Sequence, residues 1–149
     1  MIGRFAIVAA TFVAMSPSAA LAGPGSPPIW LLRKHCEESP GTVKLCAYQF
    51  ANGSGNWAVT KQKTELGYPS SSTVFSVTIQ NGDDNAAYTG QYGTDLSAKT
   101  IQNGDDNRSG ILQVGDDNKT SIVQNGDGIW SASSTVGDDT TVTIVSNGY

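Results

Sequence analysis

A glutamine recurs every eleven residues in the second half of the chain, and a glycine follows two residues after each position of that series. The glutamines are Gln80, Gln91, Gln102, Gln113 and Gln124, and the next two positions in the register are Thr135 and Ser146. The glycine position is filled without exception, by Gly82, Gly93, Gly104, Gly115, Gly126, Gly137 and Gly148. Such a repeat predicts a fold of stacked units, because each unit buries its face against the next.

Each eleven-residue unit predicts one short β-strand and one tight turn. The positions after each glycine are mostly Asp and Asn, and these residues, with Gly, tolerate the positive φ of a tight turn. The stretches between the turns are rich in Thr, Val, Ile and Ser, which favour strands. The expected strands are 74–80, 85–91, 96–102, 107–113, 118–124, 129–135 and 140–146.

Alternate units resemble one another more closely than neighbouring units do. The residue before the glycine is Asn in every second unit (Asn81, Asn103, Asn125 and Asn147) and Tyr or Val in the others. The true period is therefore 22 residues, which corresponds to two strands and two turns. We predict an all-β fold, a two-strand-per-coil β-solenoid with 22-residue coils and seven strands, whose coils stack about 4.8 Å apart through parallel pairing.

Side-chain parity separates the inside of this solenoid from its outside. Each glutamine shares a face with the residues two, four and six positions earlier, and that face carries no charge. The opposite face carries Tyr88, Lys99, Arg108, Lys119 and Trp130, so we place it outside. The glutamines then stack in two columns, in which each amide finds its partners in the coils above and below. The end coils cannot complete these columns, which predicts a tendency to add another subunit.

The segment Gln80-x-Gly82-x-x-Asn85-x-Ala87-x-x-x-Gln91 resembles the curlin repeat, Q-x-G-x-x-N-x-A-x-x-x-Q, and the resemblance extends over 74–149. It implies a secreted bacterial subunit that self-assembles into extracellular amyloid-like curli fibres on the cell surface, for adhesion and biofilm matrix. It also implies related curlin subunits and an outer-membrane secretion channel as partners. The implied self-assembly ladder consists of the five glutamines together with Asn85, Asn107 and Asn118. The last two units lose Gln and Asn, so we expect the C-terminal end to be a weak stacker or a cap.

The N-terminal half lies outside the repeat and is predicted to have two parts. Residues 1–22 have the positive start, the short apolar run and the Ala20-Leu21-Ala22 site of a secretory signal peptide, and the run is too short to span a bilayer. We therefore expect a mature chain from Gly23 onward without a membrane span. Residues 23–73 are predicted to be an irregular N-terminal segment that serves export or capping, with a disordered leader as the alternative. Its two cysteines, Cys36 and Cys46, are expected to form one disulfide in an oxidising compartment.

Other function classes find little support in the sequence. Without residues 1–22 the chain has eight basic and thirteen acidic residues, a net charge of −5 without a basic patch, which argues against nucleic acid. The single His35 lies outside the repeat and no nucleophile motif is present, so we predict neither enzyme activity, nor a cofactor, nor a metal site. The alternative function is a monomeric secreted solenoid that binds calcium or a surface polymer. Acidic turns such as Asp105-Asp106 suit calcium, but the nine-residue period of calcium-binding β-rolls is absent.

Overall fold

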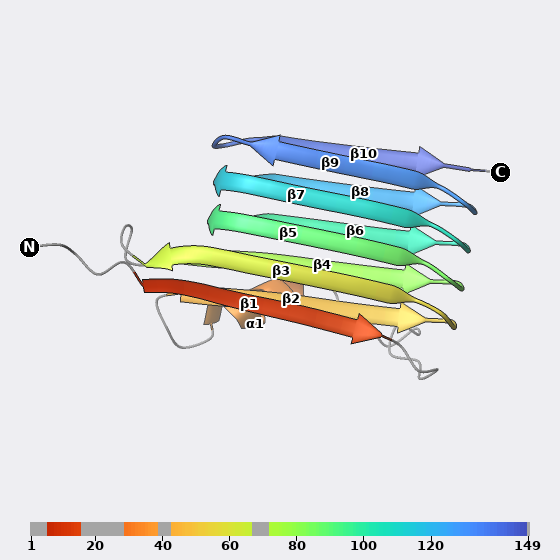
Figure 1. The fold of residues 1–149 in the computed structure, drawn as a ribbon, viewed down its shortest axis with the longest axis horizontal. Coiled ribbons are helices and arrows are strands. Elements are labelled where there is room, and N and C mark those ends of the chain that lie inside the picture. Colours follow the sequence, from red (N-terminus) through yellow and green to blue (C-terminus); the bar gives the residue numbers. More distant parts are fainter. Residues whose placement is uncertain (1–5, 16–28, 39–42, 67–71, 149) are drawn as a thin grey trace, which may run out of the picture.

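The computed structural model describes residues 6–15, 29–38, 43–66 and 72–148 (Figure 1). Within these residues there are one helix and ten strands. Their bounds are β1 (Ala6–Met15), α1 (Ile29–Glu38), β2 (Val43–Asn52), β3 (Trp57–Leu66), β4 (Ser72–Asn81), β5 (Ala86–Thr94), β6 (Ser97–Asn103), β7 (Arg108–Asp116), β8 (Lys119–Asn125), β9 (Trp130–Val136) and β10 (Thr141–Asn147). Sheet A has the order β1-β3-β5-β7-β9, and sheet B has the order β10-β8-β6-β4-β2.

The two sheets form a flattened β-solenoid, which confirms the predicted fold class. Strands that follow one another in the sequence lie in opposite sheets, and each strand from β2 to β8 pairs in parallel with the strand two places further along. Gln80 stands opposite Gln102, and Gln102 opposite Gln124, so one coil takes 22 residues as predicted. The seven predicted strands correspond to β4 through β10.

The solenoid begins earlier than the sequence repeat does. Strands β2 and β3 form a further coil, in which Gln62 pairs with Gln91 and Ala51 with Gln80, at an offset of 29 residues. The later coils have an offset of 22 residues, so the connection between β3 and β4 contains seven additional residues. The structure thus differs from the predicted irregular segment 23–73, because 43–66 is regular solenoid; 23–28, 39–42 and 67–71 lie outside the described residues.

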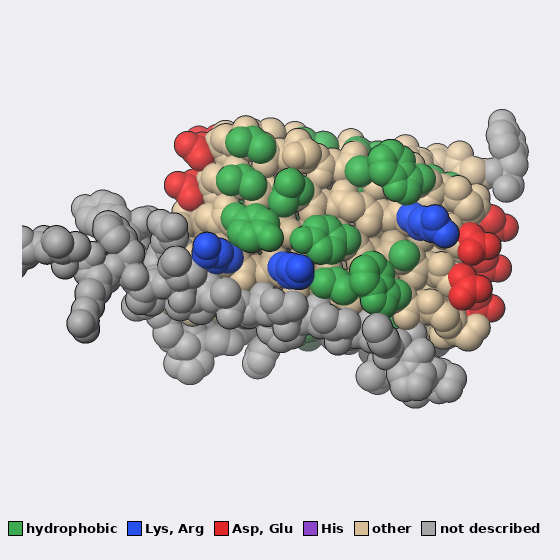
Figure 2. Space-filling view, viewed as in Figure 1, with side chains coloured by type: hydrophobic (Ala, Val, Ile, Leu, Met, Phe, Trp, Pro, Cys, Tyr) green, Lys and Arg blue, Asp and Glu red, His purple; other side chains and the backbone are tan. Residues whose placement is uncertain are grey.

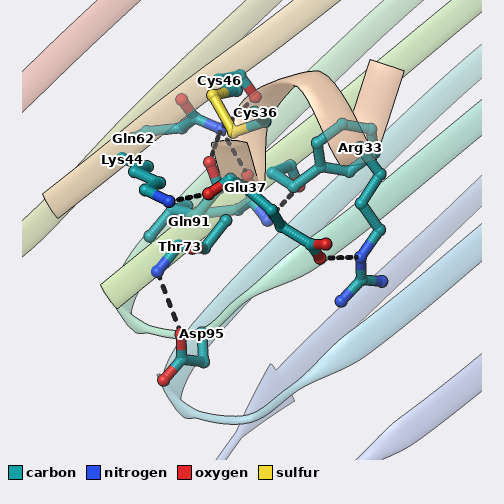
Figure 3. The surroundings of a disulfide bond; sticks show 11 residues. Arg33, Cys36, Glu37, Lys44, Cys46, Gln62, Thr73, Gln91 and Asp95 are labelled. Carbon is teal, nitrogen blue, oxygen red and sulfur yellow. Dashed lines mark hydrogen bonds and ion pairs between the residues drawn. A yellow bond between two sulfur atoms is a disulfide. The ribbon is translucent and has the colours of Figure 1, made fainter. Parts of the chain in front are cut away.

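Helix α1 covers the outer face of sheet B at the N-terminal end (Figure 3). A disulfide joins Cys36 of α1 to Cys46 of β2, with a Cα–Cα distance of 6.1 Å. Cys36 forms a buried cluster with Phe75 and Val77 of β4. By parity Phe75 and Val77 point outward from the solenoid, but the helix shields them from solvent. The disulfide therefore fixes a small second core outside the coils.

Residues 6–15, the apolar run of the predicted signal peptide, form β1 in this structure. β1 pairs with β3, and this is the antiparallel pair among the described strands. It occupies the edge of β3, the first parallel strand of sheet A. The predicted cleavage site at 20–22 lies outside the described residues. The described helix is too short and too polar to cross a membrane.

Candidate functional site

Two columns of buried glutamines run through the interior. In sheet A, Gln62 Nε2 donates to Gln91 Oε1 at 3.0 Å, and Gln91 Nε2 donates to Gln113 Oε1 at 2.9 Å. We call this column the A ladder. In the B ladder, Gln80 donates to Gln102 and Gln102 to Gln124 in the same way, each at 2.9 Å. All six side chains are at most 2 % exposed, so the ladders stabilise the stack only where each amide has a partner.

The glutamine amides also connect the two sheets across the narrow interior. Gln102 Nε2 in sheet B donates to the backbone carbonyl of Ala86 in sheet A at 3.0 Å. Gln113 Nε2 in sheet A donates to the carbonyl of Ser97 in sheet B at 3.1 Å. These bonds provide the cross-links that an apolar core would otherwise supply, because few large aliphatic side chains lie inside. The interior is therefore polar, and most of its polar groups have hydrogen-bond partners.

The interior asparagines connect consecutive coils through backbone amides. Asn85 Oδ1 accepts from the backbone amide of Asn107, and Asn107 Oδ1 accepts from that of Ile129, both at 3.0 Å. Asn118 Oδ1 accepts from Thr140 in the same way. Side-chain amides do stack on each other outside the coils, from Asn81 through Asn103 and Asn125 to Asn147.

The acidic turn residues form two rows, one along each edge of the solenoid, and Figure 2 shows red side chains at both edges. Their carboxylates accept hydrogen bonds from the coil before. Asp105 Oδ1 accepts from the backbone amide of Asp83 at 2.7 Å, and Asp138 Oδ1 from that of Asp116 at 3.0 Å. Among the described residues, no three His, Cys, Asp or Glu side chains gather into a metal site. The acidic residues therefore connect consecutive turns.

The glycines stand where consecutive turns approach most closely. Gly104 has a φ of +110°, and a Cβ placed on it would lie 2.4 Å from the carbonyl oxygen of Gly126 in the next coil. At Gly93 the corresponding distance, to the oxygen of Gly115, would be 1.8 Å. Both the backbone conformation and the stacking distance therefore require glycine.

At the N-terminal end the A ladder stops with an acceptor that has no partner. Gln62 Oε1 is buried and makes no hydrogen bond, and the side chain is 1 % exposed. Its backbone neighbour is Ala10 of β1. In sheet B the outermost strand is β2, where Ala51 takes the glutamine position. The end is thus a polar edge that is incomplete inside one molecule.

At the C-terminal end both ladders stop at hydroxyl side chains. Thr135 takes the glutamine position in β9 and Ser146 takes it in β10. The outer faces of these two strands carry the most exposed large apolar side chains of the described residues: Val136 is 75 % exposed, Trp130 74 % and Val145 59 %. The end coil is therefore less regular than the coils before it, and its apolar side chains are uncovered.

The sequence prediction missed one set of ladder residues. Gly53, Asn56 and Gln62 take the positions of Gly82, Asn85 and Gln91 one coil earlier. The string Gly53-x-x-Asn56-x-Ala58-x-x-x-Gln62 matches most of the repeat pattern and was the available signal. A strict eleven-residue register does not detect it, because the additional residues between β3 and β4 shift the phase.

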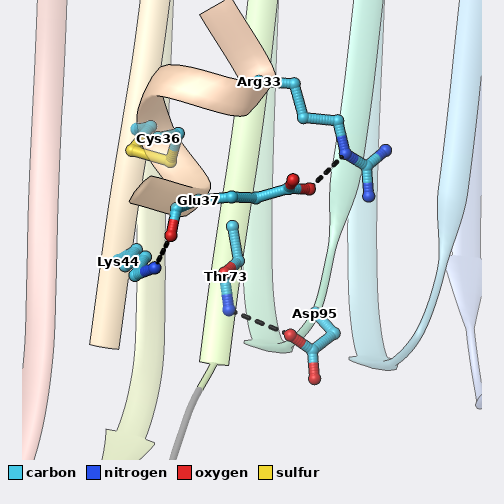
Figure 4. A network of polar contacts seen from close by, with 7 residues as sticks. Arg33, Cys36, Glu37, Lys44, Thr73 and Asp95 are labelled. Atoms are coloured by element: carbon cyan, nitrogen blue, oxygen red, sulfur yellow. Dashed lines mark hydrogen bonds and ion pairs between the residues drawn. A yellow bond between two sulfur atoms is a disulfide. The ribbon is translucent and has the colours of Figure 1, made fainter. Parts of the chain in front are cut away.

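A groove of about 240 Å³ lies where α1 meets the turns before β6 and β8 (Figure 4). Arg33 Nε donates to Glu37 Oε1 at 2.8 Å, and Lys44 Nζ donates to the backbone carbonyl of Glu37. On the other side Asp95 accepts from the backbone amide of Thr73 at 2.9 Å. Charges of both signs line the groove, so it does not select an ion of either sign.

The repeat geometry agrees with the comparison with known families, in which the model of the curlin associated repeat matches residues 93–126. Residues 93–126 are thus similar to the curlin associated repeat. The matched segment spans β6, β7 and β8, with the ladder residues Gln102, Gln113 and Gln124, and confirms the resemblance predicted from the sequence. No curated protein and no solved structure matched the chain.

Proposed function

We propose that this chain is a secreted structural subunit that self-assembles into extracellular amyloid-like curli fibres, which serve adhesion and the biofilm matrix. The observation that carries the proposal is the pair of glutamine ladders, each of which joins three stacked strands and stops before the ends of the solenoid. The curlin repeat over 93–126 supports the same assignment.

The physical reason for growth is the state of the end strands. An edge strand presents a row of unpaired backbone N–H and C=O groups, which another strand can satisfy. Gln62 Oε1 adds a specific demand: it has no partner inside the chain, and burying it under another strand without a donor costs about 1–3 kcal/mol. Stacking a second subunit satisfies both demands at once and extends the parallel pairing into a cross-β fibre.

The remaining parts of the proposal concern export and partners. We propose that residues 1–22 are a signal peptide and that the mature chain leaves the cell through an outer-membrane secretion channel and assembles with itself and with related curlin subunits. Loss of residues 1–22 would remove β1 and free the edge of β3. Export would then produce the assembly-competent end.

The test is whether the exported chain polymerises by seeded growth. The chain would be expressed with its own leader in a bacterial host, recovered in denaturant, checked by mass and diluted into buffer with thioflavin T. We expect a lag that preformed seeds abolish, followed by fibres with cross-β diffraction. A β-rich monomer that never binds the dye would contradict the proposal and favour the monomeric binding protein, which calcium titration would then examine.

A further inference from the structure

The number of parallel strands determines how two subunits can stack end to end. Among the described residues, sheet A without β1 contains four strands and sheet B contains five. The parallel solenoid of nine strands therefore makes four and a half coils. The first strand of this solenoid, β2, and the last strand, β10, both lie in sheet B, whereas a continuous solenoid would place the strand after β10 in sheet A. An unrotated copy therefore begins in the sheet in which the copy before it ends.

We infer that consecutive copies of this chain stack head to tail through a half-turn about the fibre axis, so that β9 pairs with β2 of the next copy and β10 pairs with β3 of the next copy. This inference rests on the proposed function and specifies its interface. Strands of the two sheets run in opposite directions, so a half-turn makes sheet B of one copy parallel to sheet A of the copy before it. The half-turn therefore continues the parallel pairing without a break.

Stacking without rotation leaves backbone groups at the junction without hydrogen-bond partners. If β10 pairs with β2 of an unrotated copy, sheet A has one strand fewer than sheet B at each junction. The edges of β9 and β3 would then face each other across an empty strand position, with their backbone groups unpaired. Direct pairing of β9 with β3 would instead force β10 and β2 into the same space.

The half-turn junction supplies a donor to the unpartnered glutamine. Ser146 and Gln62 both occupy the glutamine position of their strands. If the pairing of the coils continues across the junction, Ser146 of β10 stands opposite Gln62 of β3 in the next copy. The Ser146 hydroxyl lies 3.0 Å from the Ser131 hydroxyl and can accept from it. The Ser146 hydrogen is then free to donate to the buried Gln62 Oε1, and the A ladder of one copy continues into the preceding subunit.

The turns at the junction are also matched. Gly137 has no atom within 4 Å of the position where a Cβ would stand, whereas Gly115, one coil earlier, meets the oxygen of Gly137 there. The half-turn places Gly53 of the next copy over Gly137. Ser54 and Gly55 take the positions of Asp83 and Asp84, so Asp138 meets an uncharged turn. The acidic row is thus interrupted where two subunits must meet.

The structure also predicts what covers the apolar end strand. In this register Trp130 of β9 stands opposite Cys46 of the next copy, the residue whose disulfide holds α1 against β2 and β4. The exposed indole would then lie beside the small outer core that α1 closes. The exposure of Trp130 in the single chain is consistent with a contact surface between copies.

Pairs of variants that each carry one cysteine in addition to the Cys36–Cys46 disulfide test the junction directly. The half-turn places Lys61 opposite Val145 of the preceding copy, whereas alignment of sheet A on sheet A would place Lys61 opposite Ser134. All three side chains are exposed in the single chain. Exported K61C would be co-assembled with V145C, or with S134C as the matched control, then oxidised and analysed by mass spectrometry for the mixed disulfide.

We expect the K61C–V145C cross-link to exceed the K61C–S134C cross-link at least tenfold. Helical reconstruction of unmodified fibres should give a rise of about 22 Å per subunit with a rotation of roughly 180°, from coils about 4.8 Å apart. Fibres that cross-link K61C to S134C, that cross-link neither pair, or that show no half-turn would overturn this inference alone. If no fibres form, both this inference and the proposed function are wrong.

Discussion

Replacing Gly104 by alanine should destabilise the solenoid far more than the same replacement at Gly128 or Gly110. Gly104 has a φ of +110°, and a new Cβ would lie 2.4 Å from Gly126 O. Gly128 has a φ of +66° with nothing within 4 Å of the new atom. Gly110 has no positive φ, and its nearest neighbour would be Ala132 Cβ at 3.8 Å. The three sites therefore separate the stacking distance from the backbone conformation.

The expected magnitudes follow from these geometries. At Gly104 a strained backbone costs about 1–3 kcal/mol and the overlap with the next coil about as much again, so we expect a loss of about 2–6 kcal/mol. At Gly128 the left-handed conformation alone costs an L-residue about 1–2 kcal/mol. At Gly110 the alanine should be neutral or stabilise the fold by about 0.4–1 kcal/mol, because it restricts the unfolded chain.

The assay is urea unfolding of the soluble chain, followed by circular dichroism below the concentration at which assembly begins. The three variants would be compared with the unmodified chain in free energy of unfolding. Equal losses for G104A and G128A would show that the approach of consecutive turns is not what requires glycine. A loss for G110A as large as that for G104A would contradict the claim that positive φ and the close approach of the next turn are what require glycine.

Three further predictions follow from the ladders, the disulfide and the outer face. Gln102→Leu leaves Gln124 Oε1 without its buried donor and should lower the free energy of unfolding by about 1–3 kcal/mol, whereas Lys99→Gln on the outside should change it by less than about 0.5 kcal/mol, both measured by urea unfolding. Reduction of the disulfide, whose cysteines are ten residues apart, should lower the free energy of unfolding by about 3 kcal/mol. It should also raise the hydrogen exchange of α1 while that of β6 to β8 stays low. Uniform exchange throughout would contradict a separate outer core. Burial, and then the neighbouring Tyr92, raises the pKa of Tyr88, so the folded chain favours the neutral phenol. The stability of the fold should therefore fall as the pH rises above about 10, where Tyr88 ionises more readily in the unfolded chain. Y88F should weaken that fall in thermal unfolding measured across pH.

The repeat region was predictable because its determinants are local. The residues around Gln102 specify a strand, a turn and an inner face within eleven positions, and the same pattern recurs in the next unit. Side-chain parity then placed the glutamines inside, where the structure has them. The coil formed by β2 and β3 was missed for a local reason too, because seven additional residues before β4 shift the register without changing the pairing.

The sequence by itself determined the period, the two-strand coil, the polar interior and the glycine turns, because these depend on contacts that recur in every coil. Only the tertiary structure decided that α1 covers Phe75, that interior asparagines bond to backbone amides, and that Gln62 Oε1 lacks a partner. The reason is that a repeat describes the neighbours of an average coil. The end strands differ from the average coil because one of their two neighbours is absent. Which groups are left unpaired there depends on the number of strands in the solenoid.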